Sequence, residues 1–282
     1  MNASDSSQAT STTVAQRRAL LATCVTAAVK GADVIRAHAQ NIANIAWEEK
    51  SRADFVSEVD RESERAIADI VRERHPDAKL LGEELSPELA AAHLARGLVF
   101  VADPLDGTTN FLHGFLWYAV SIAALQDGVP VAGAILNVPT GELFTAVAGN
   151  GARRSGQPIS VSKVEDPGRA LIGTGFPFKV TEQIDDYIRG FVAITKAVAG
   201  IRRPGSAALD LADVACGRLD AFWELSLAPW DVAAGILLVR EAGGIVTDRN
   251  GQPAQVAHTS IVAGNPTMHA WVSERVRGQE QG

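Results

Sequence analysis

The sequence predicts a mixed protein of the α+β and α/β classes, built as one large domain or two closely packed halves. Residues 14–40 carry apolar side chains at the three- and four-residue spacing of an amphipathic helix. Between residues 118 and 146, β-forming segments alternate with the turn dipeptides Asp127-Gly128 and Thr140-Gly141, which favours an antiparallel sheet. From residue 157 onward, strand-like and helix-like segments are mixed.

Changes of pattern also divide the chain. Residues 1–13 are rich in Ser, Thr and Ala and are predicted to form a disordered tail, and residues 277–282 are interpreted in the same way. A boundary near residue 155 separates an N-terminal α+β half, residues 14–154, from a C-terminal α/β half, residues 155–276. We expect the second half to complete a site whose first motifs lie in the first half.

Composition limits the classes of function. The chain has 282 residues and a formal net charge of −7, which argues against direct nucleic-acid binding because phosphate backbones are bound by clustered Lys and Arg. An anionic substrate would therefore need bound cations. Two cysteines, Cys24 and Cys216, give no disulfide framework, and no apolar run reaches the length of a membrane span. With no signal-peptide pattern at the start, we expect a cytoplasmic protein.

The first half contains two groups of acids. An alternating segment from Asp54 to Asp60 predicts an extended stretch that leads into a helix over residues 61–74. Asp60 stands at the start of that helix, where it is either a plain N-cap or also a carboxylate facing a site. A short strand over residues 79–81 then delivers Gly82-Glu83-Glu84. Adjacent acids commonly lie on solvated surface, but the glycine allows the backbone to turn one of them inward.

The most informative stretch is Asp103-Pro104-Leu105-Asp106-Gly107-Thr108-Thr109-Asn110, which follows an apolar run that predicts a buried strand. Pro104 cannot donate to a sheet ladder, so the strand is expected to stop at Asp103. The Asp-Gly pair then turns the chain, and the Thr-Thr-Asn after it favours a short helix whose free backbone N–H groups face the carboxylates. Two acids beside such a helix start suggest a metal together with a phosphate.

Two further acids stand on elements of the second half. Glu224 lies near the end of a predicted strand, and Asp231 lies in the first turn of a helix that begins at Pro229. The helix dipole alone favours an Asp there, so a structural and a functional role are both open. From residue 118 onward we predict strands over residues 118–125, 131–137, 142–146, 159–161, 170–173, 219–225, 245–247 and 260–263, and helices over 184–198, 205–215, 229–242 and from 265.

Several catalytic signatures are missing from the sequence. The six histidines have no zinc-binding interval on a helix, and neither a serine nucleophile elbow nor a Gly-x-x-x-x-Gly-Lys phosphate loop occurs. The Asp103 stretch fails as a calcium loop because its third and fifth positions are Leu105 and Gly107. Hard oxygen donors without sulfur or imidazole suit Mg²⁺, and paired Mg²⁺ ions support phosphate ester hydrolysis by an activated water. The remaining acids are Glu83, Asp103, Asp106 and Asp231, with Asp60 behind them.

Three motifs together resemble the inositol monophosphatase family: Gly82-Glu83-Glu84, residues 103–111 and residues 230–235. The resemblance covers nearly all of residues 14–276, and residues 202–212 are similar to the bacterial inositol-1-monophosphatases. It implies a layered α-β-α-β-α sandwich of the sugar-phosphatase type, a homodimer, and inhibition by lithium. The nearest rival, a haloacid dehalogenase-type phosphatase, places its two acids two residues apart, whereas those of this chain are three apart.

The resemblance also implies roles for individual residues. Two or three Mg²⁺ ions would be bound, and the backbone N–H groups of Gly107 and Thr108 would contact the phosphate. The Thr108 hydroxyl, near Asp60, would orient the attacking water, with Glu83 as a further catalytic residue. The implied metal ligands are Glu83, Asp103, the carbonyl of Leu105, Asp106 and Asp231. The implied substrate contacts are Asp106, Gly107, Thr108, Ala207, Glu224 and Asp231.

The sequence departs from the family's common pattern at a few positions around the pocket. Leu116 stands where many relatives have proline, Ser57 where threonine is frequent, and Lys50 only loosely matches an expected lysine. The function implied is Mg²⁺-dependent hydrolysis of inositol monophosphate or a related small sugar or polyol phosphate. Fructose 1,6-bisphosphate, histidinol phosphate, NADP and adenosine bisphosphate are alternative substrates. An alternative of another class is a protein-binding role in transcription complexes.

Overall fold

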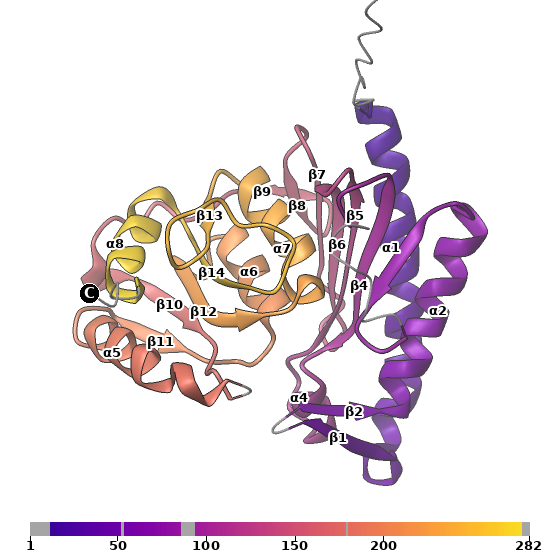
Figure 1. The fold of residues 1–282 in the computed structure, drawn as a ribbon, viewed down its shortest axis with the longest axis horizontal. Coiled ribbons are helices and arrows are strands. Elements are labelled where there is room, and N and C mark those ends of the chain that lie inside the picture. The colour runs from indigo at the N-terminus through magenta and orange to yellow at the C-terminus, as the bar shows by residue number, and fades with distance from the viewer. Residues whose placement is uncertain (1–11, 52–53, 86–93, 179, 278–282) are drawn as a thin grey trace, which may run out of the picture.

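The computed structural model describes residues 12–51, 54–85, 94–178 and 180–277, and it has five layers (Figure 1). Two helices cover the outer face of a seven-stranded sheet, two lie between that sheet and a five-stranded sheet, and two cover the far face of the second sheet. The predicted α-β-α-β-α sandwich is confirmed. In this order the helices are α1 (Val14–His38) and α2 (Glu58–Arg74), α6 (Ala207–Ala215) and α7 (Pro229–Glu241), and α5 (Ile184–Thr195) and α8 (Pro266–Val276).

The first sheet has the order β3-β4-β5-β6-β7-β8-β9, and its pairs are antiparallel except for β3 with β4. The antiparallel pairing predicted for residues 118–146 is confirmed. In the tight turn between β5 and β6, Asp127 and Gly128 both have positive φ angles, 51° and 82°, as two-residue hairpins favour. The strands are β3 (Lys79–Gly82), β4 (Leu98–Asp106), β5 (Ala119–Gln126), β6 (Val129–Asn137), β7 (Leu143–Val147), β8 (Ala152–Arg154) and β9 (Gln157–Ile159).

The second sheet, of order β11-β10-β12-β14-β13, is mixed. β10 pairs parallel with β11 and β12, and β14 pairs antiparallel with β12 and β13. The strand predicted over residues 219–225 begins and ends two residues later, so Glu224 lies inside β12 rather than near its end. The strands are β10 (Leu171–Thr174), β11 (Gly200–Arg202), β12 (Ala221–Leu227), β13 (Ile245–Thr247) and β14 (Thr259–Gly264).

Three short strands were not predicted: β8, β11 and β1 (Trp47–Ser51), which forms a two-stranded antiparallel sheet with β2 (Asp54–Ser57). The predicted N-terminal tail lies mostly outside the described residues, but Thr13 is described and caps α1 through a bond to Gln16 N. Of the predicted C-terminal tail, only Arg277 is described. The division near residue 155 stays a prediction; β9, which belongs to the first sheet, lies beyond it.

The β4 strand continues through Asp103 to Asp106, and the prediction that it stops at Asp103 was wrong. Asp103 pairs with Ser121 and Asp106 pairs with Ala119, so three steps along β4 match two steps along β5. This extra residue is a β-bulge, and the bulge tolerates Pro104 because a ladder bond is already interrupted there. Cross-strand partners share a face, and so do residues two apart on β5. The bulge therefore places both aspartates on one face of the sheet.

The position of Asp60 also differs from the prediction. α2 begins at Glu58 rather than near residue 61, with Ser57 as its N-cap, so Asp60 is the third residue of the helix rather than its cap. Asp60 Oδ2 accepts a bond of 2.9 Å from the Ser57 N–H, and Ser57 Oγ accepts from Val59 N. This reciprocal capping fixes the Asp60 side chain within the first turn.

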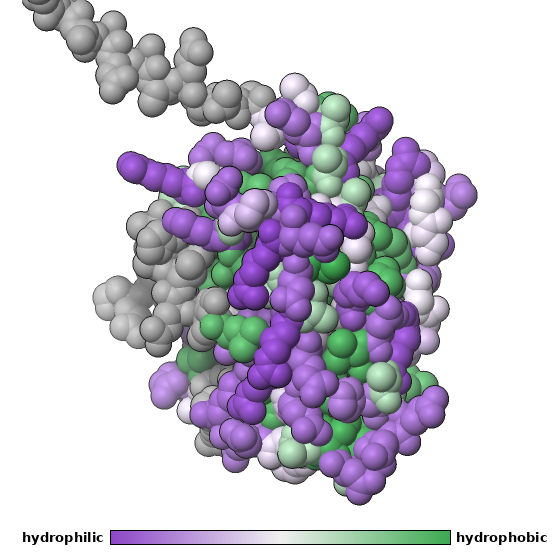
Figure 2. All heavy atoms as spheres, turned by 90° about the vertical axis from the view of Figure 1, so that its right-hand side faces the viewer, coloured by the Kyte–Doolittle hydropathy of each residue, from purple (hydrophilic) through white to green (hydrophobic). Residues whose placement is uncertain are grey.

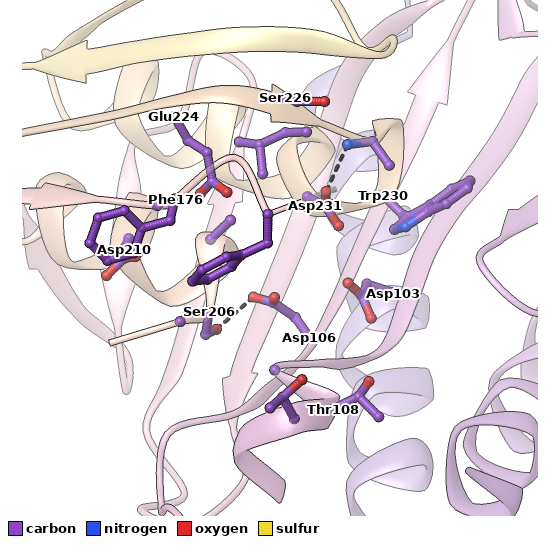
Figure 3. Close-up of a pocket in the computed structure, with 18 of the residues that line it drawn as sticks. Asp103, Asp106, Thr108, Phe176, Ser206, Asp210, Glu224, Ser226, Trp230 and Asp231 are labelled. Carbon is purple, nitrogen blue, oxygen red and sulfur yellow. Dashed lines mark hydrogen bonds between the residues drawn. The ribbon is translucent and has the colours of Figure 1, made fainter. Parts of the chain in front are cut away.

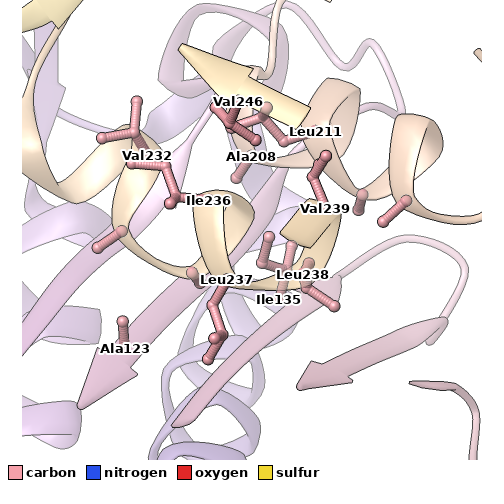
Figure 4. Close-up of a cluster of buried hydrophobic side chains, with 14 of the residues drawn as sticks. Ala123, Ile135, Ala208, Leu211, Val232, Ile236, Leu237, Leu238, Val239 and Val246 are labelled. Carbon is pink, nitrogen blue, oxygen red and sulfur yellow. The ribbon is translucent and has the colours of Figure 1, made fainter. Parts of the chain in front are cut away.

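The middle layer shares one apolar core between the two halves of the chain (Figure 4). Ile135 of the first sheet and Val246 of the second belong to the same buried cluster as Leu237 of α7. Gly235 lets α6 and α7 approach closely, because a Cβ there would lie 2.4 Å from the Leu211 side chain. The surface over α1 and α2 is mostly hydrophilic (Figure 2). Within the described ranges, no helix has the length and apolar character needed to cross a bilayer.

Candidate active site

A cavity of about 650 Å³ is lined by residues from both halves of the chain. From the first half come the turn after β3, the bulge of β4 and the short helix α4 (Thr108–Leu112). From the second half come the end of β10, the start of α6, the middle of β12 and the start of α7. The cavity therefore gathers segments from across the whole chain, and all three motifs of the sequence contribute to it.

The predicted metal-binding acids meet at this cavity. Asp103 and Asp106 project from the bulge of β4, and Asp231 comes from the first turn of α7 (Figure 3). Glu83 lies in the turn that follows β3 and lines the same space. Leu105, whose carbonyl was predicted to be a ligand, stands between the two aspartates of the bulge.

The electrostatics of these acids are unfavourable without a cation. Asp103 is only 2% exposed, and its pKa is raised well above the ordinary range by burial and then by the negative charges of Glu83, Asp106 and Asp231. Burial raises the pKa of Asp106 to about 6, although hydrogen bonds from Ser206 and Ala208 oppose this shift. Buried like charges disfavour ionisation, and a bound cation reverses that effect.

The donor set fits a hard divalent cation. It consists of carboxylate and carbonyl oxygens, without histidine or cysteine, which suits ions such as Mg²⁺ rather than zinc. Within the part of the chain that the structure describes, no three His, Cys, Asp or Glu side chains lie in an arrangement that could hold a metal ion as it stands. Mg²⁺ commonly takes only one or two carboxylates directly and keeps several waters.

Hydrogen bonds orient two of the acids. Asp106 Oδ2 accepts from the Ser206 hydroxyl at 2.5 Å and from the Ala208 N–H at 2.8 Å. Asp231 Oδ2 accepts from the Ala228 N–H at 2.7 Å, so Asp231 holds the start of α7 in the way that Asp60 holds the start of α2. Asp231 is thus fixed by the backbone at the start of its own helix, whereas Asp106 is fixed by groups of α6 that lie about 100 positions away in the chain.

The Thr108 hydroxyl links the bulge to α2. Its Oγ1 lies 2.8 Å from Asp60 Oδ1 and 3.0 Å from the Leu105 carbonyl oxygen. Asp60 is 1% exposed, and burial raises its pKa. Gly107, with φ of +96°, precedes Thr108 in a left-handed conformation that glycine adopts readily. The predicted proximity of Thr108 to Asp60 is present in the structure.

The opposite wall of the cavity carries two of the six predicted substrate contacts, Ala207 and Glu224. Ala207 is the first residue of α6, and Glu224 extends from β12 (Figure 3). The Glu224 carboxylate occupies space left by Gly175, since a Cβ at residue 175 would lie 2.0 Å from Glu224 Oε2. Asp210, which sequence reasoning did not select, lines the same wall and is 1% exposed.

Two other site residues were missed. Ser206 was expected only to open a helix, and a local pattern does not reveal that its hydroxyl bonds to Asp106. Lys50, which only loosely matches the expected lysine, forms ion pairs with Glu83 at 3.1 Å and with Glu84. Burial opposes the charge of Lys50, but Glu83 and Glu84 raise its pKa overall. For Glu84, by contrast, burial raises the pKa, to about 7.

Comparisons with known proteins agree with the fold and with the motifs. A sequence model described as the inositol monophosphatase family matches residues 16–281. The chain is 44% identical to the Nus factor SuhB of Pseudomonas aeruginosa, over 78% of this chain and 82% of that protein. It is 40% identical to an inositol-1-monophosphatase of Synechocystis, over 83% of this chain and 81% of that protein.

Solved structures give the same picture. The extragenic suppressor protein suhB from Bartonella henselae superposes with a TM-score of 0.85 and 38% identity, covering 93% of this chain and 100% of that one. The inositol monophosphatase from Anabaena superposes with a TM-score of 0.81 and 35% identity, covering 93% of this chain and 96% of that one.

Proposed function

The chain belongs to the inositol monophosphatase family, and we propose on this premise that it is a Mg²⁺-dependent phosphomonoesterase for inositol monophosphate or a related small sugar or polyol phosphate. One observation carries the proposal: acids from three distant motifs line one cavity beside the start of α4. A purely structural strand and turn would not need buried acids on both sides of Pro104.

The proposed metal ligands are the residues that already repel one another in the cavity. Bound Mg²⁺ supplies positive charge that neutralises the phosphate oxygens and acidifies water. We assign two ions, with a third near Glu83, to the same donors that the sequence predicted. These donors are Glu83, Asp103, the Leu105 carbonyl, Asp106 and Asp231.

Thr108 and Asp60 would orient the attacking water. The Thr108 hydroxyl has one proton but two acceptors within reach, Asp60 and the Leu105 carbonyl. With the Leu105 carbonyl as a metal ligand, the hydroxyl would donate to Asp60, and its lone pairs would be left to accept from a water. Asp60, held by the capping bonds of α2, keeps that hydroxyl in a fixed orientation.

The two sides of the cavity would divide the substrate between them. The backbone N–H groups of Gly107 and Thr108 would contact the phosphate, with Asp106 and Asp231 next to it. Ala207 and Glu224, on the opposite wall, would contact the ring hydroxyls. Because carboxylate oxygens accept from hydroxyl groups, this wall favours a polyol over an apolar leaving group.

The family resemblance also supports a homodimer that lithium inhibits; these features and the expected cytoplasmic location are part of the proposal. Relatives that carry the name Nus factor SuhB favour a second candidate, the protein-binding role in transcription complexes. The two functions do not exclude each other. A chain with a protein-binding role can also keep the acids of the proposed phosphatase site, and this chain has them.

A substrate panel tests the proposal. Phosphate release would be measured for inositol 1-phosphate, fructose 1,6-bisphosphate, histidinol phosphate, NADP and adenosine bisphosphate, each with Mg²⁺ and with a chelator. We expect Mg²⁺-dependent turnover that is highest for inositol phosphate or another polyol phosphate. Turnover that survives chelation would contradict the metal mechanism. Absence of hydrolysis across the panel, in protein shown to bind Mg²⁺, would favour the second candidate.

A further inference from the structure

Helix α2 presents three buried polar side chains to the segments that carry the candidate metal site, and only Asp60 has a role in the proposed reaction. Ser63 and Glu64 lie one turn further along the helix and are both 0% exposed. A buried carboxylate needs partners to offset its lost hydration. The partners of Ser63 and Glu64 are the two backbone segments that carry the first-half ligands.

Ser63 holds the bulge of β4. Its hydroxyl donates to the Pro104 carbonyl oxygen at 2.9 Å. The Pro104 carbonyl belongs to the peptide between Pro104 and Leu105, so the bond fixes the backbone between two proposed ligands, Asp103 and Leu105. A bulge interrupts the regular hydrogen bonds between strands. Here the Ser63 side chain of α2 provides a hydrogen bond to a backbone carbonyl of the bulge.

Glu64 holds the turn that carries Glu83. Its carboxylate accepts from the Glu84 N–H at 2.6 Å and from the Leu85 N–H at 3.0 Å. Gly82 is required for this approach, because a Cβ there would lie 2.0 Å from Glu64 Oε1. The motif glycine therefore makes room for the Glu64 carboxylate as well as allowing the backbone to turn.

Burying the Glu64 carboxylate close to the acid Glu83 is electrostatically unfavourable. Burial raises the pKa of Glu64, the N–H groups of Glu84 and Leu85 oppose this shift, and the negative charge of Glu83 adds to it. A neutral side chain would tie the turn without that repulsion. A carboxylate there adds negative charge around the place where a cation would bind, as residues that orient metal ligands commonly do.

We propose that Ser63 and Glu64 are positioning residues that fasten the bulge of β4 and the Glu83 turn to one rigid helix, and so set the spacing of the first-half metal ligands. This inference rests on the proposed function, because it assumes that Glu83, Asp103 and Leu105 bind Mg²⁺. Neither residue touches the substrate or the metal; both act through the backbone of the ligands.

Calorimetric titration with Mg²⁺ tests the inference without using activity. Glu64→Gln keeps the shape of the side chain, but its amide NH₂ group would face one of the two backbone N–H donors and could not accept from it. We therefore expect the Kd for Mg²⁺ to rise about 10- to 100-fold. Ser63→Ala is expected to shift the Kd in the same direction by less. Glu62→Gln is the matched control on α2, since Glu62 is exposed and pairs with His38.

Two further measurements separate positioning from loss of the fold. In Glu64→Gln, amide hydrogen exchange should quicken at Glu84 and Leu85, while the α1 amides keep wild-type protection. Saturating Mg²⁺ should restore turnover toward wild type. If Glu64→Gln does not fold, Ser63→Ala decides by the same titration.

Equal Mg²⁺ affinity of Glu64→Gln, Ser63→Ala and the Glu62→Gln control would overturn the inference. Wild-type protein that binds Mg²⁺ but hydrolyses no phosphate ester would overturn the proposed function and leave the titration as the test of positioning. Wild-type protein that binds no Mg²⁺ would overturn both.

Discussion

Ser206 donates a hydrogen bond of 2.5 Å to Asp106, although 100 positions separate the two residues in the chain. Ser206 caps α6 in the middle layer, while Asp106 ends β4 in the first sheet. The Ala208 N–H adds a second bond to the same carboxylate oxygen. One proposed metal ligand is therefore oriented by an element of the other half, so the site depends on how the two halves pack.

Ser206→Ala should lower the affinity of the candidate site for Mg²⁺ without abolishing binding. The substitution removes one of two bonds to Asp106 Oδ2 and the cap of α6, so we expect Mg²⁺ affinity to fall about tenfold and stability to fall by about 1 kcal/mol. Calorimetry and urea unfolding measure the two effects. Ser226→Ala is the control, because Ser226 lines the same cavity but is exposed. An equal loss of affinity in both variants would contradict the role of Ser206.

Asp103→Asn should separate stability from activity. It removes the acid whose pKa is raised by burial and by Glu83, Asp106 and Asp231. We expect Mg²⁺-dependent phosphate release to fall about 10³-fold, since a metal site supplies several kcal/mol to the transition state. The metal-free variant should melt roughly 2–4 °C higher than wild type, which corresponds to about 1 kcal/mol. Unimpaired phosphate release would contradict the metal-binding role of Asp103, and a metal-free variant less stable than wild type would contradict the repulsion among these acids.

The hydroxyl of Thr108 should matter more for turnover than for substrate affinity. Thr108→Val keeps the shape of the side chain but cannot bond to Asp60 or to the Leu105 carbonyl, so kcat should fall about 10²-fold with little change in KM. Thr108→Ser retains the hydroxyl and should recover most of the activity. Steady-state kinetics with the preferred panel substrate measure both constants. Equal activity of Thr108→Val and Thr108→Ser would contradict a role of the Thr108 hydroxyl in the reaction.

Gly107→Ala tests the left-handed turn before α4. The φ of +96° strains any other residue, and a Cβ would lie 3.0 Å from the Trp117 carbonyl oxygen. We expect a loss of about 1–2 kcal/mol in urea unfolding together with a marked loss of turnover. Gly97→Ala is the control: its φ is +74° with nothing within 4 Å of the added Cβ, so it should lose stability but keep activity. Full activity of Gly107→Ala would contradict the assigned phosphate contact.

The stability of metal-free protein should depend on pH through Asp106. Its pKa is raised from 3.8 to about 6 in the folded state, so between these values the folded protein binds more protons than the unfolded chain. Its contribution to stability is then full below about pH 4 and is lost as pH rises through about 6. Melting temperatures of wild type and Asp106→Asn, measured in chelator from pH 4 to 7, isolate this contribution.

Added Mg²⁺ should reverse the trend, because metal binding requires the deprotonated carboxylates and so strengthens as pH rises. A difference between wild type and Asp106→Asn that stays constant across the range in chelator would contradict the raised pKa.

Local patterns in the sequence determined much of this protein. Apolar spacing predicted α1, and turn dipeptides predicted the antiparallel strands, because both signals depend on neighbouring residues alone. The motifs around Glu83, Asp103 and Asp231 identified the family and the acids that line the cavity. The resemblance, rather than any periodicity, supplied the five-layer arrangement.

Tertiary structure decided how those acids are held. The register of β4 against β5 puts Asp103 and Asp106 on one face, and register depends on pairing between strands rather than on either strand alone. The bond that Ser206 donates to Asp106 and the bond that Glu64 accepts from the Glu84 N–H join residues 100 and 20 positions apart in the chain. The sequence by itself determined which residues carry the chemistry, whereas packing of separate elements determined their geometry, because a side chain's long-range partner leaves no trace in its local pattern.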